Sequence, residues 1–341
     1  MDGLICLEPH VTASYSPRMQ TTSELLVSLG FPAKPFGVLS RFSIADLVKP
    51  GKRCGIYVLH FTDGYFYVGQ SKDVTKRFVQ HRRSDSHDDV DSIYFKQVPE
   101  PGLDEEEADI TEQLEAANVR LRNILLVSWN GGEADFDEIM PPDEQERWLA
   151  DLSLSGDADF KRLVDDELRS KYRRRFERFQ AHPQHEQVVE ILREYVKFGI
   201  PAARRGEVSF WSVSCWPSKG LFARLNLYWQ EVLSIYATEG GSTVISFHLA
   251  HSPLSQLPEA EQNSFFLRYA SLEDTNHRYR PGGADQMNLY ISQTEVLRFI
   301  RETSVLQAIR LFNLRLMRKG PSNWNRNHCM DMGDLIDGQK Q

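Results

Sequence analysis

Apolar and polar positions alternate most clearly between residues 55 and 98. Residues 55–61 are typical of a buried strand, Thr62, Asp63 and Gly64 of a turn, and residues 65–69 of a partner strand. An Asp-Gly pair between two β-rich runs is a strong hairpin signal. A third strand is expected over residues 92–98, because the apolar run there ends at Pro99.

Two helices are expected around these strands. Asp73 can cap a helix that runs to His81 and has Val74, Phe78 and Val79 at helical spacing. A second helix is expected from about residue 103 to 117, with Ile110 and Leu114 as its core stripe. Asn118 can adopt the left-handed conformation that commonly ends a helix. Residues 119–129 are apolar enough to form a closing strand or a further packed segment, so the block is β-β-α-β-α-β.

The rest of the chain divides by composition. Residues 1–50 show no strong periodicity and are interpreted as an N-terminal extension packed on a domain at 51–140. Residues 141–202 are charged and helical, which is typical of a connector. A strand candidate at 242–249 and a long helical region at 294–317 predict a second mixed α/β domain over 203–328, followed by a polar tail at 329–341. The predicted fold class is therefore α/β (α+β).

Composition narrows the class of protein. The chain has 341 residues, 41% of them hydrophobic and 26% charged, enough to bury a core in two or three domains. Its four cysteines, Cys6, Cys54, Cys215 and Cys329, include no CxxC pair, so reduced thiols in a cytoplasmic protein are expected. Neither a membrane-spanning run nor a secretory signal stands out. The formal charge is −8, but basic residues concentrate at 72–83 and 169–178.

Two tripeptides and the helix after them carry the functional signal. Gly55-Ile56-Tyr57 and Tyr67-Val68-Gly69 lie about one hairpin apart and are followed by Arg77 and His81. Over residues 53–130 the chain resembles the GIY-YIG nuclease family, with Val68 in place of the usual isoleucine. The resemblance implies a small module with a central, mostly antiparallel three-stranded sheet flanked by helices. It also implies hydrolysis of phosphodiester bonds with one divalent ion, Mg²⁺ or Mn²⁺, per active site.

The resemblance assigns roles to individual residues. Tyr57 would be the general base, and Tyr67 would position water or phosphate beside it. Arg77 would hold phosphate oxygens with its planar guanidinium, and His81 would contact the scissile phosphate or accept a proton. Gly69, Gln70, Ser71 and Lys72 would line the substrate cleft. The structural alternatives are two tyrosines that pack in the core, a solvated helix arginine and a surface histidine.

Two carboxylates remain as candidates for the metal ligand. Family members place a single glutamate on a helix after the third strand, and one carboxylate with waters is an ordinary way to hold Mg²⁺. Glu107 is preferred, because Ile110 and Leu114 would anchor its side of the helix against the sheet. Glu115 is the alternative, with Glu106 and Glu112 behind it. Asn123 matches an asparagine that braces the site in the family.

Partners follow from these assignments. The favoured function is a metal-dependent endonuclease acting on nucleic acid, with DNA preferred over RNA, in restriction, phage defence or repair. A catalytically inactive nucleic-acid-binding or regulatory protein is the alternative, and a structural subunit is a third hypothesis. A homodimer would cut both strands, and the C-terminal domain is a candidate surface for nucleic acid or a protein partner.

Residues 169–179 interleave aromatic and basic side chains, which suits either phosphate tracking or a buried stripe of Tyr172, Phe176 and Phe179.

Overall fold

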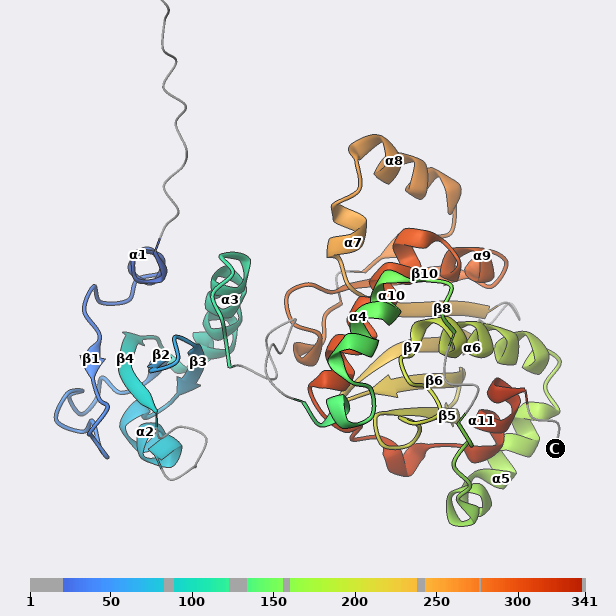
Figure 1. Cartoon of the computed structure of the whole chain (residues 1–341), viewed down its shortest axis with the longest axis horizontal. Coiled ribbons are helices and arrows are strands. Elements are labelled where there is room, and N and C mark those ends of the chain that lie inside the picture. Colours follow the sequence, from blue (N-terminus) through green and yellow to red (C-terminus); the bar gives the residue numbers. More distant parts are fainter. Residues whose placement is uncertain are drawn as a thin grey trace, which may run out of the picture. The chain divides into compact units, whose positions relative to one another are not determined.

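The computed structural model describes residues 21–82, 89–122, 134–155, 160–237, 243–275 and 277–338 (Figure 1). The chain forms two compact units. The N-terminal unit comprises residues up to 64, 68–110 and 116–119, and the C-terminal unit comprises 65–67, 111–115 and everything from 120 onward. Both units mix helices with antiparallel sheets, so the mixed α/β class is confirmed. No helix within the described ranges is long and apolar enough to cross a membrane.

The N-terminal sheet has four strands in the order β1-β4-β2-β3. They are β1 (Phe36–Gly37), β2 (Gly55–Phe61), β3 (Phe66–Ser71) and β4 (Val90–Gln97). The hairpin turn between β2 and β3 contains Gly64 at φ +80°, a conformation that glycine adopts at little cost. The predicted three strands are present, and β1 adds a fourth from the supposed extension by pairing antiparallel with β4.

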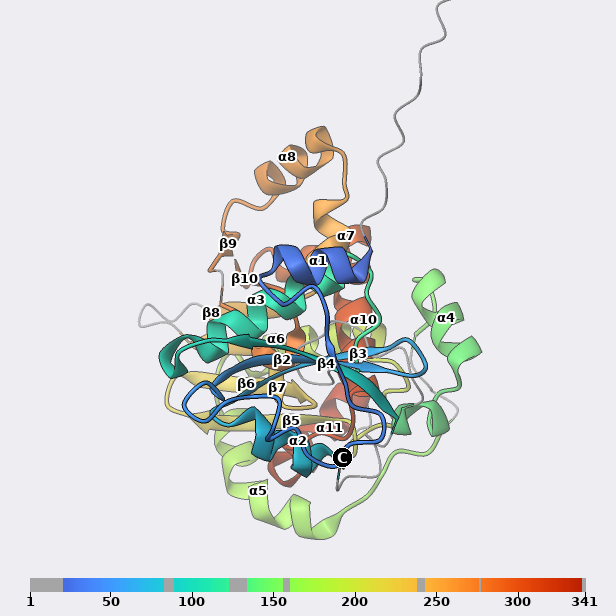
Figure 2. The ribbon, with the colours of Figure 1, turned by 90° about the vertical axis from the view of Figure 1, so that its left-hand side faces the viewer.

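Helices cover both faces of this sheet (Figure 2). Helices α1 (Thr22–Ser28) and α3 (Leu103–Ala116) lie on one face, and α2 (Val74–Arg82) lies on the other. The predicted Asp73 cap is confirmed, since its Oδ1 accepts hydrogen bonds from the backbone N–H groups of Thr75 and Lys76. The expected stripe of Ile110 and Leu114 is fully buried.

The C-terminal unit is built on a six-stranded antiparallel sheet in the order β5-β6-β7-β8-β10-β9. Its strands are β5 (Trp211–Ser218), β6 (Leu221–Leu227), β7 (Gln230–Ala237), β8 (Thr243–Leu249), β9 (Glu273–Asp274) and β10 (Met287–Ser292). The described helices of this unit are α4 (Pro142–Ala150), α5 (Asp166–Gln180), α6 (His185–Gly199), α7 (Ser252–Ser255), α8 (Glu259–Arg268), α9 (Val296–Ile300), α10 (Thr303–Arg318) and α11 (Met330–Asp337). One continuous hydrophobic core joins these helices to the sheet.

Three sequence expectations differ from this arrangement. Residues 141–202 are helical, but α5 and α6 contribute to the core of the C-terminal unit instead of forming a detached connector. The expected polar tail contains α11, whose Met332 is fully buried, because nearby arginines compensate the acidic residues that made the segment look polar. The long helical region near 294–317 is divided into α9 and α10 at Arg301 and Glu302.

Candidate functional site

Three of the predicted site residues meet on one face of the N-terminal sheet. The Tyr57 side chain is buried on β2, and its hydroxyl oxygen lies 2.7 Å from Nε2 of His81 on α2. The Arg77 Nε–H group donates to the same hydroxyl over 3.4 Å. The two aromatic rings meet edge to face with centroids 5.6 Å apart. The Tyr57 hydroxyl is therefore held between an imidazole and a guanidinium.

Local sequence explains why α2 presents these side chains together. Arg77 and His81 are four residues apart, so they project from the same side of the helix one turn apart. Buried Val74 and Phe78 fix the rotation of the helix against the sheet. Arg77 itself is exposed, and its NH1 group also donates to Gln80 Oε1 over 3.1 Å. Gln80 in turn lines a cavity of about 390 Å³ beside α2.

A second polar group joins β3 to α3. The Gln70 Nε2 atom donates to Asp104 Oδ1 over 2.6 Å and to Glu107 Oε2 over 2.9 Å. Asp104 and Glu107 are three residues apart in the first turns of α3, so both carboxylates reach the same amide. The preferred metal candidate Glu107 thus lies in direct contact with Gln70, one of the residues expected to line the substrate cleft.

Strand geometry relates these two groups. The short turn joins β2 and β3 as an antiparallel pair, so Tyr57 near the start of β2 and Gln70 near the end of β3 lie at the same end of the sheet. Gln70 faces α3. Tyr67, three residues earlier on β3, therefore points to the opposite face, the one that α2 covers. The Tyr57 group therefore lies on the face of the sheet that α2 covers, and the Gln70 group lies on the opposite face, which α3 covers.

The remaining predicted residues have local roles in the structure. Gly69 is buried within β3, and the Ser71 Oγ atom accepts a hydrogen bond from the Asp73 backbone N–H. Lys72 forms an exposed ion pair with Glu100. Asn123 lies outside the described residues.

Two of the other glutamates are set apart from Gln70. Glu106 pairs with Lys96 on β4. Glu115 follows Glu107 by eight residues, which places it roughly 12 Å further along the axis of α3. Among the described residues, no cluster of three or more His, Cys, Asp or Glu side chains forms a ready metal cage.

No known protein family, curated protein or solved structure matches this chain.

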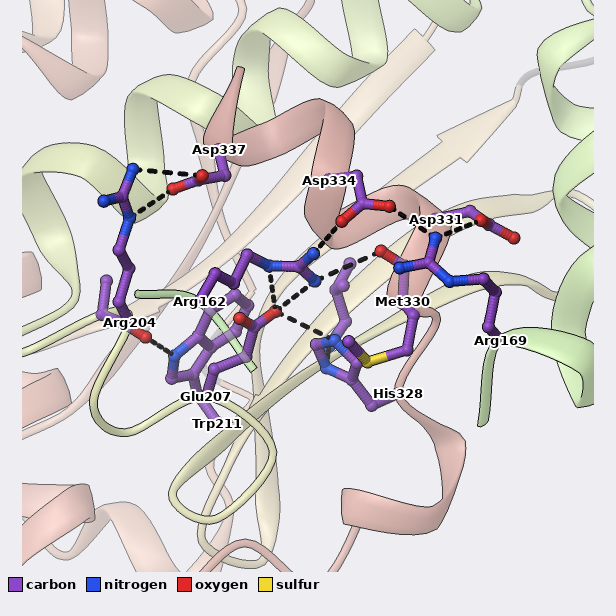
Figure 3. A network of polar contacts seen from close by, with 12 residues as sticks. Arg162, Arg169, Arg204, Glu207, Trp211, His328, Met330, Asp331, Asp334 and Asp337 are labelled. Atoms are coloured by element: carbon purple, nitrogen blue, oxygen red, sulfur yellow. Dashed lines mark hydrogen bonds and ion pairs between the residues drawn. The ribbon is translucent and has the colours of Figure 1, made fainter. Parts of the chain in front are cut away.

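The C-terminal unit contains a buried ionic network that the sequence did not reveal (Figure 3). The Arg162 guanidinium contacts the Glu207 carboxylate over 2.6 Å and also bonds Asp334. Glu207 also lies 3.1 Å from His328 Nε2. Burial alone would raise the pKa of Glu207, but the hydrogen bonds and charges of His328 and Arg162 outweigh it and lower that pKa. A cavity of about 320 Å³ borders the network.

Several cations near the C-terminus are paired inside this unit. Arg315 pairs with Asp285, and Arg318 pairs with Asp137. The Lys319 ammonium donates to the Pro281 carbonyl. The aromatic stripe of α5 is buried, so its core interpretation is confirmed. These side chains stabilise the fold.

Proposed function

We propose that this protein is a metal-dependent endonuclease that hydrolyses phosphodiester bonds in nucleic acid, with DNA as the favoured substrate. The observation that carries the proposal is the contact of Tyr57 with both Arg77 and His81, because these are three of the residues that the family resemblance nominated for the chemistry. Their meeting depends on a strand and a helix that the two tripeptides and the following basic segment define.

Arg77 supplies the phosphate-binding step. Its guanidinium is exposed and carries five N–H donors in a fixed plane, a geometry that suits two phosphate oxygens. A phosphate that draws Arg77 away from the tyrosine would expose the Tyr57 oxygen, which is otherwise buried. Phosphate binding and exposure of the Tyr57 oxygen would thereby be coupled.

Tyr57 and His81 supply a proton route. In the imidazole tautomer that leaves His81 Nε2 without a proton, the phenolic O–H group of Tyr57 donates to that nitrogen. A water molecule that attacks phosphorus would pass a proton to the Tyr57 oxygen while the phenolic proton moves to His81. Tyr67, on the same face of the sheet, would orient the water or the phosphate.

The residues present fit a hard divalent cation. The carboxylates of Asp104 and Glu107 converge on one amide nitrogen, and carboxylate oxygens are the ligands that Mg²⁺ and Mn²⁺ prefer. Glu107 would hold the ion, with Asp104 beside it and Gln70 released toward the substrate. Bound there, on the face opposite to Tyr57, the ion would stabilise negative charge on a phosphate that reaches it around the β3 edge of the sheet.

The test is an incubation of the purified chain with supercoiled plasmid, single-stranded DNA and RNA, each with Mg²⁺, Mn²⁺ or EDTA. We expect metal-dependent nicking or linearisation that Arg77→Ala abolishes. Salt-dependent binding with no cleavage under any metal condition would instead identify a catalytically inactive nucleic-acid-binding protein. Neither binding nor cleavage would reject both functions. Restriction, phage defence and repair remain the biological settings that we propose.

A further inference from the structure

The six-stranded sheet of the C-terminal unit has a polar face. Its strand register places an apolar row across five strands: Val213, Leu225, Leu233, Phe247 and Leu289. Side chains alternate between the two faces of a strand, so the neighbouring rows point the other way. Those rows consist almost entirely of hydrogen-bonding side chains.

The register defines two polar rows. The first contains Ser214, Arg224, Ser234, Ser246 and Tyr290 on β5, β6, β7, β8 and β10. The second pairs Ser212 with Asn226 and Glu231, and His248 with Asn288. Tyr279 joins the two halves of the second row, since its hydroxyl donates to Glu231 Oε1 over 2.6 Å and its ring lies 4.9 Å from that of His248.

Several groups on this face are buried without a hydrogen-bond partner among the described residues. They include both ring nitrogens of His248, which is only 2% exposed, and the side-chain amide nitrogen of Asn226, which is 1% exposed. Such groups cost free energy unless they are satisfied. Burial also lowers the pKa of His248 to about 4, so the imidazole is neutral at pH 7 and offers one donor and one acceptor.

The border of the polar face is more accessible and aromatic. Tyr236 and Tyr290 are half-buried and stack with ring centroids 6.4 Å apart. The segment 277–280 alternates His277, Arg278, Tyr279 and Arg280, and both arginines are exposed. Aromatic faces alternating with cations suit a ligand that combines a flat ring with phosphate.

We propose that the polar face of this sheet binds a single nucleobase of a nucleic-acid strand. Neutral hydroxyl, amide and imidazole groups match the donors and acceptors along a base edge, whereas a phosphate site would need unpaired cations. Tyr236 and Tyr290 would stack on the base, and Arg278 and Arg280 would contact its backbone. The inference rests on the proposed function, because it supplies the base recognition that the small nuclease module lacks.

The test measures binding of the full chain in EDTA, so that cleavage plays no part. Five fluorescein-labelled single-stranded oligonucleotides are compared, four differing in one central base and the fifth abasic at that position. We expect the preferred base to bind at least about tenfold more tightly than the abasic strand. The ratio of these two affinities should fall close to one in the variants His248→Phe and Asn226→Leu. Both substitutions keep side-chain volume and remove hydrogen-bonding groups.

Controls separate recognition from folding. His185→Phe makes the same substitution at the start of α6 and should leave the ratio unchanged. Tyr290→Ala, at a half-buried position, should reduce the ratio even if a buried variant fails to fold. Equal affinity of the wild-type chain for all five strands, or ratios that survive all three site variants, would overturn the inference.

The two proposals fail separately. Cleavage of DNA in Mg²⁺ without any base discrimination in EDTA would leave the nuclease standing and remove the base site. Discrimination between bases in EDTA without cleavage in any metal would remove the nuclease function and leave the base site standing.

Discussion

The Tyr57 hydroxyl lies 2.7 Å from His81 Nε2, and this contact joins the first strand of the predicted hairpin to the helix that follows it. It gives a buried phenol a partner that can take its proton. The same contact stabilises the fold, so catalysis and stability have to be measured side by side.

Tyr57→Phe removes the hydroxyl and keeps the ring. We expect cleavage to fall by about 100-fold or more, because a positioned acid or base contributes 10²–10⁴-fold. The free energy of unfolding should fall by about 1–3 kcal/mol, because the hydroxyl takes part in two hydrogen bonds and one of them is to the buried His81. Tyr94→Phe on β4 is the matched control, since the Tyr94 hydroxyl lies 3.3 Å from Ser23 Oγ, outside the site. Plasmid nicking rates and urea denaturation would check both values, and equal activity of the two variants would contradict the assigned role.

Glu107→Gln and Glu115→Gln distinguish the two metal candidates. Glu107 shares Gln70 with Asp104, whereas Glu115 lies two turns further along α3. We expect Glu107→Gln to abolish cleavage and to weaken Mn²⁺ binding measured by isothermal titration calorimetry. Glu115→Gln should keep both. The reverse result would move the metal site to Glu115 and leave the nuclease assignment intact.

The sequence predicted features that depend on local interactions and missed those that depend on residues distant in the chain. Three features that depend on neighbouring residues were predicted correctly: the hairpin, the Asp73 cap and the left-handed Asn118 at φ 58°. The two-residue strand β1 was missed, because so short a segment carries no periodicity. Arg162 and Asp334 are separated by 172 positions, so no local pattern could pair them. The shared helix face of Arg77 and His81 follows from their four-residue spacing, whereas their contact with Tyr57 was accessible only through the family resemblance.

Gly333→Ala should strongly destabilise the C-terminal unit. A Cβ atom at this position would lie 1.9 Å from an Arg162 guanidinium nitrogen and 2.7 Å from Glu207 Oε1. The arginine would have to leave its buried partners, and breaking a buried ion pair costs about 3–5 kcal/mol. Gly37→Ala is the comparison, because nothing lies within 4 Å of the added atom. Thermal denaturation followed by circular dichroism would measure both, and a Gly333→Ala midpoint within 2 °C of wild type would contradict the packing described.

Asp285 should contribute stability that disappears in acid. Burial would raise the pKa of its carboxyl, but hydrogen bonds from Arg315 and Ser252 more than offset this and lower the pKa. A group with a lowered folded pKa stabilises the protein above its unfolded pKa of about 3.9 and loses that contribution as the pH falls through the folded value. The difference in unfolding free energy between wild type and Asp285→Asn should therefore be constant from pH 7 to about 5 and shrink below about 4. A difference that shrinks already between pH 7 and 5 would contradict this sign.

Arg310→Lys tests a buried cation that holds together segments distant in sequence. Arg310 is fully buried, and its guanidinium donates to the backbone carbonyls of Trp148, Asp151, Leu152, Leu154 and Phe198. The guanidinium carbon also lies 4.4 Å from the centroid of the Trp148 ring. Burial lowers the pKa of Arg310 to about 10, so the side chain remains charged at pH 7.

A lysine at position 310 keeps the charge but has three donors on one atom, and it cannot reach carbonyls arranged around a planar fork. We expect a loss of about 3 kcal/mol or more in the free energy of unfolding, because several buried carbonyls lose their donor. Arg301→Lys is the matched control, since Arg301 is 64% exposed in its ion pair with Glu194. That substitution should cost less than about 1 kcal/mol. Denaturant titrations of both variants would measure the difference, and similar costs at the two positions would show that the buried contacts of Arg310 add little to stability.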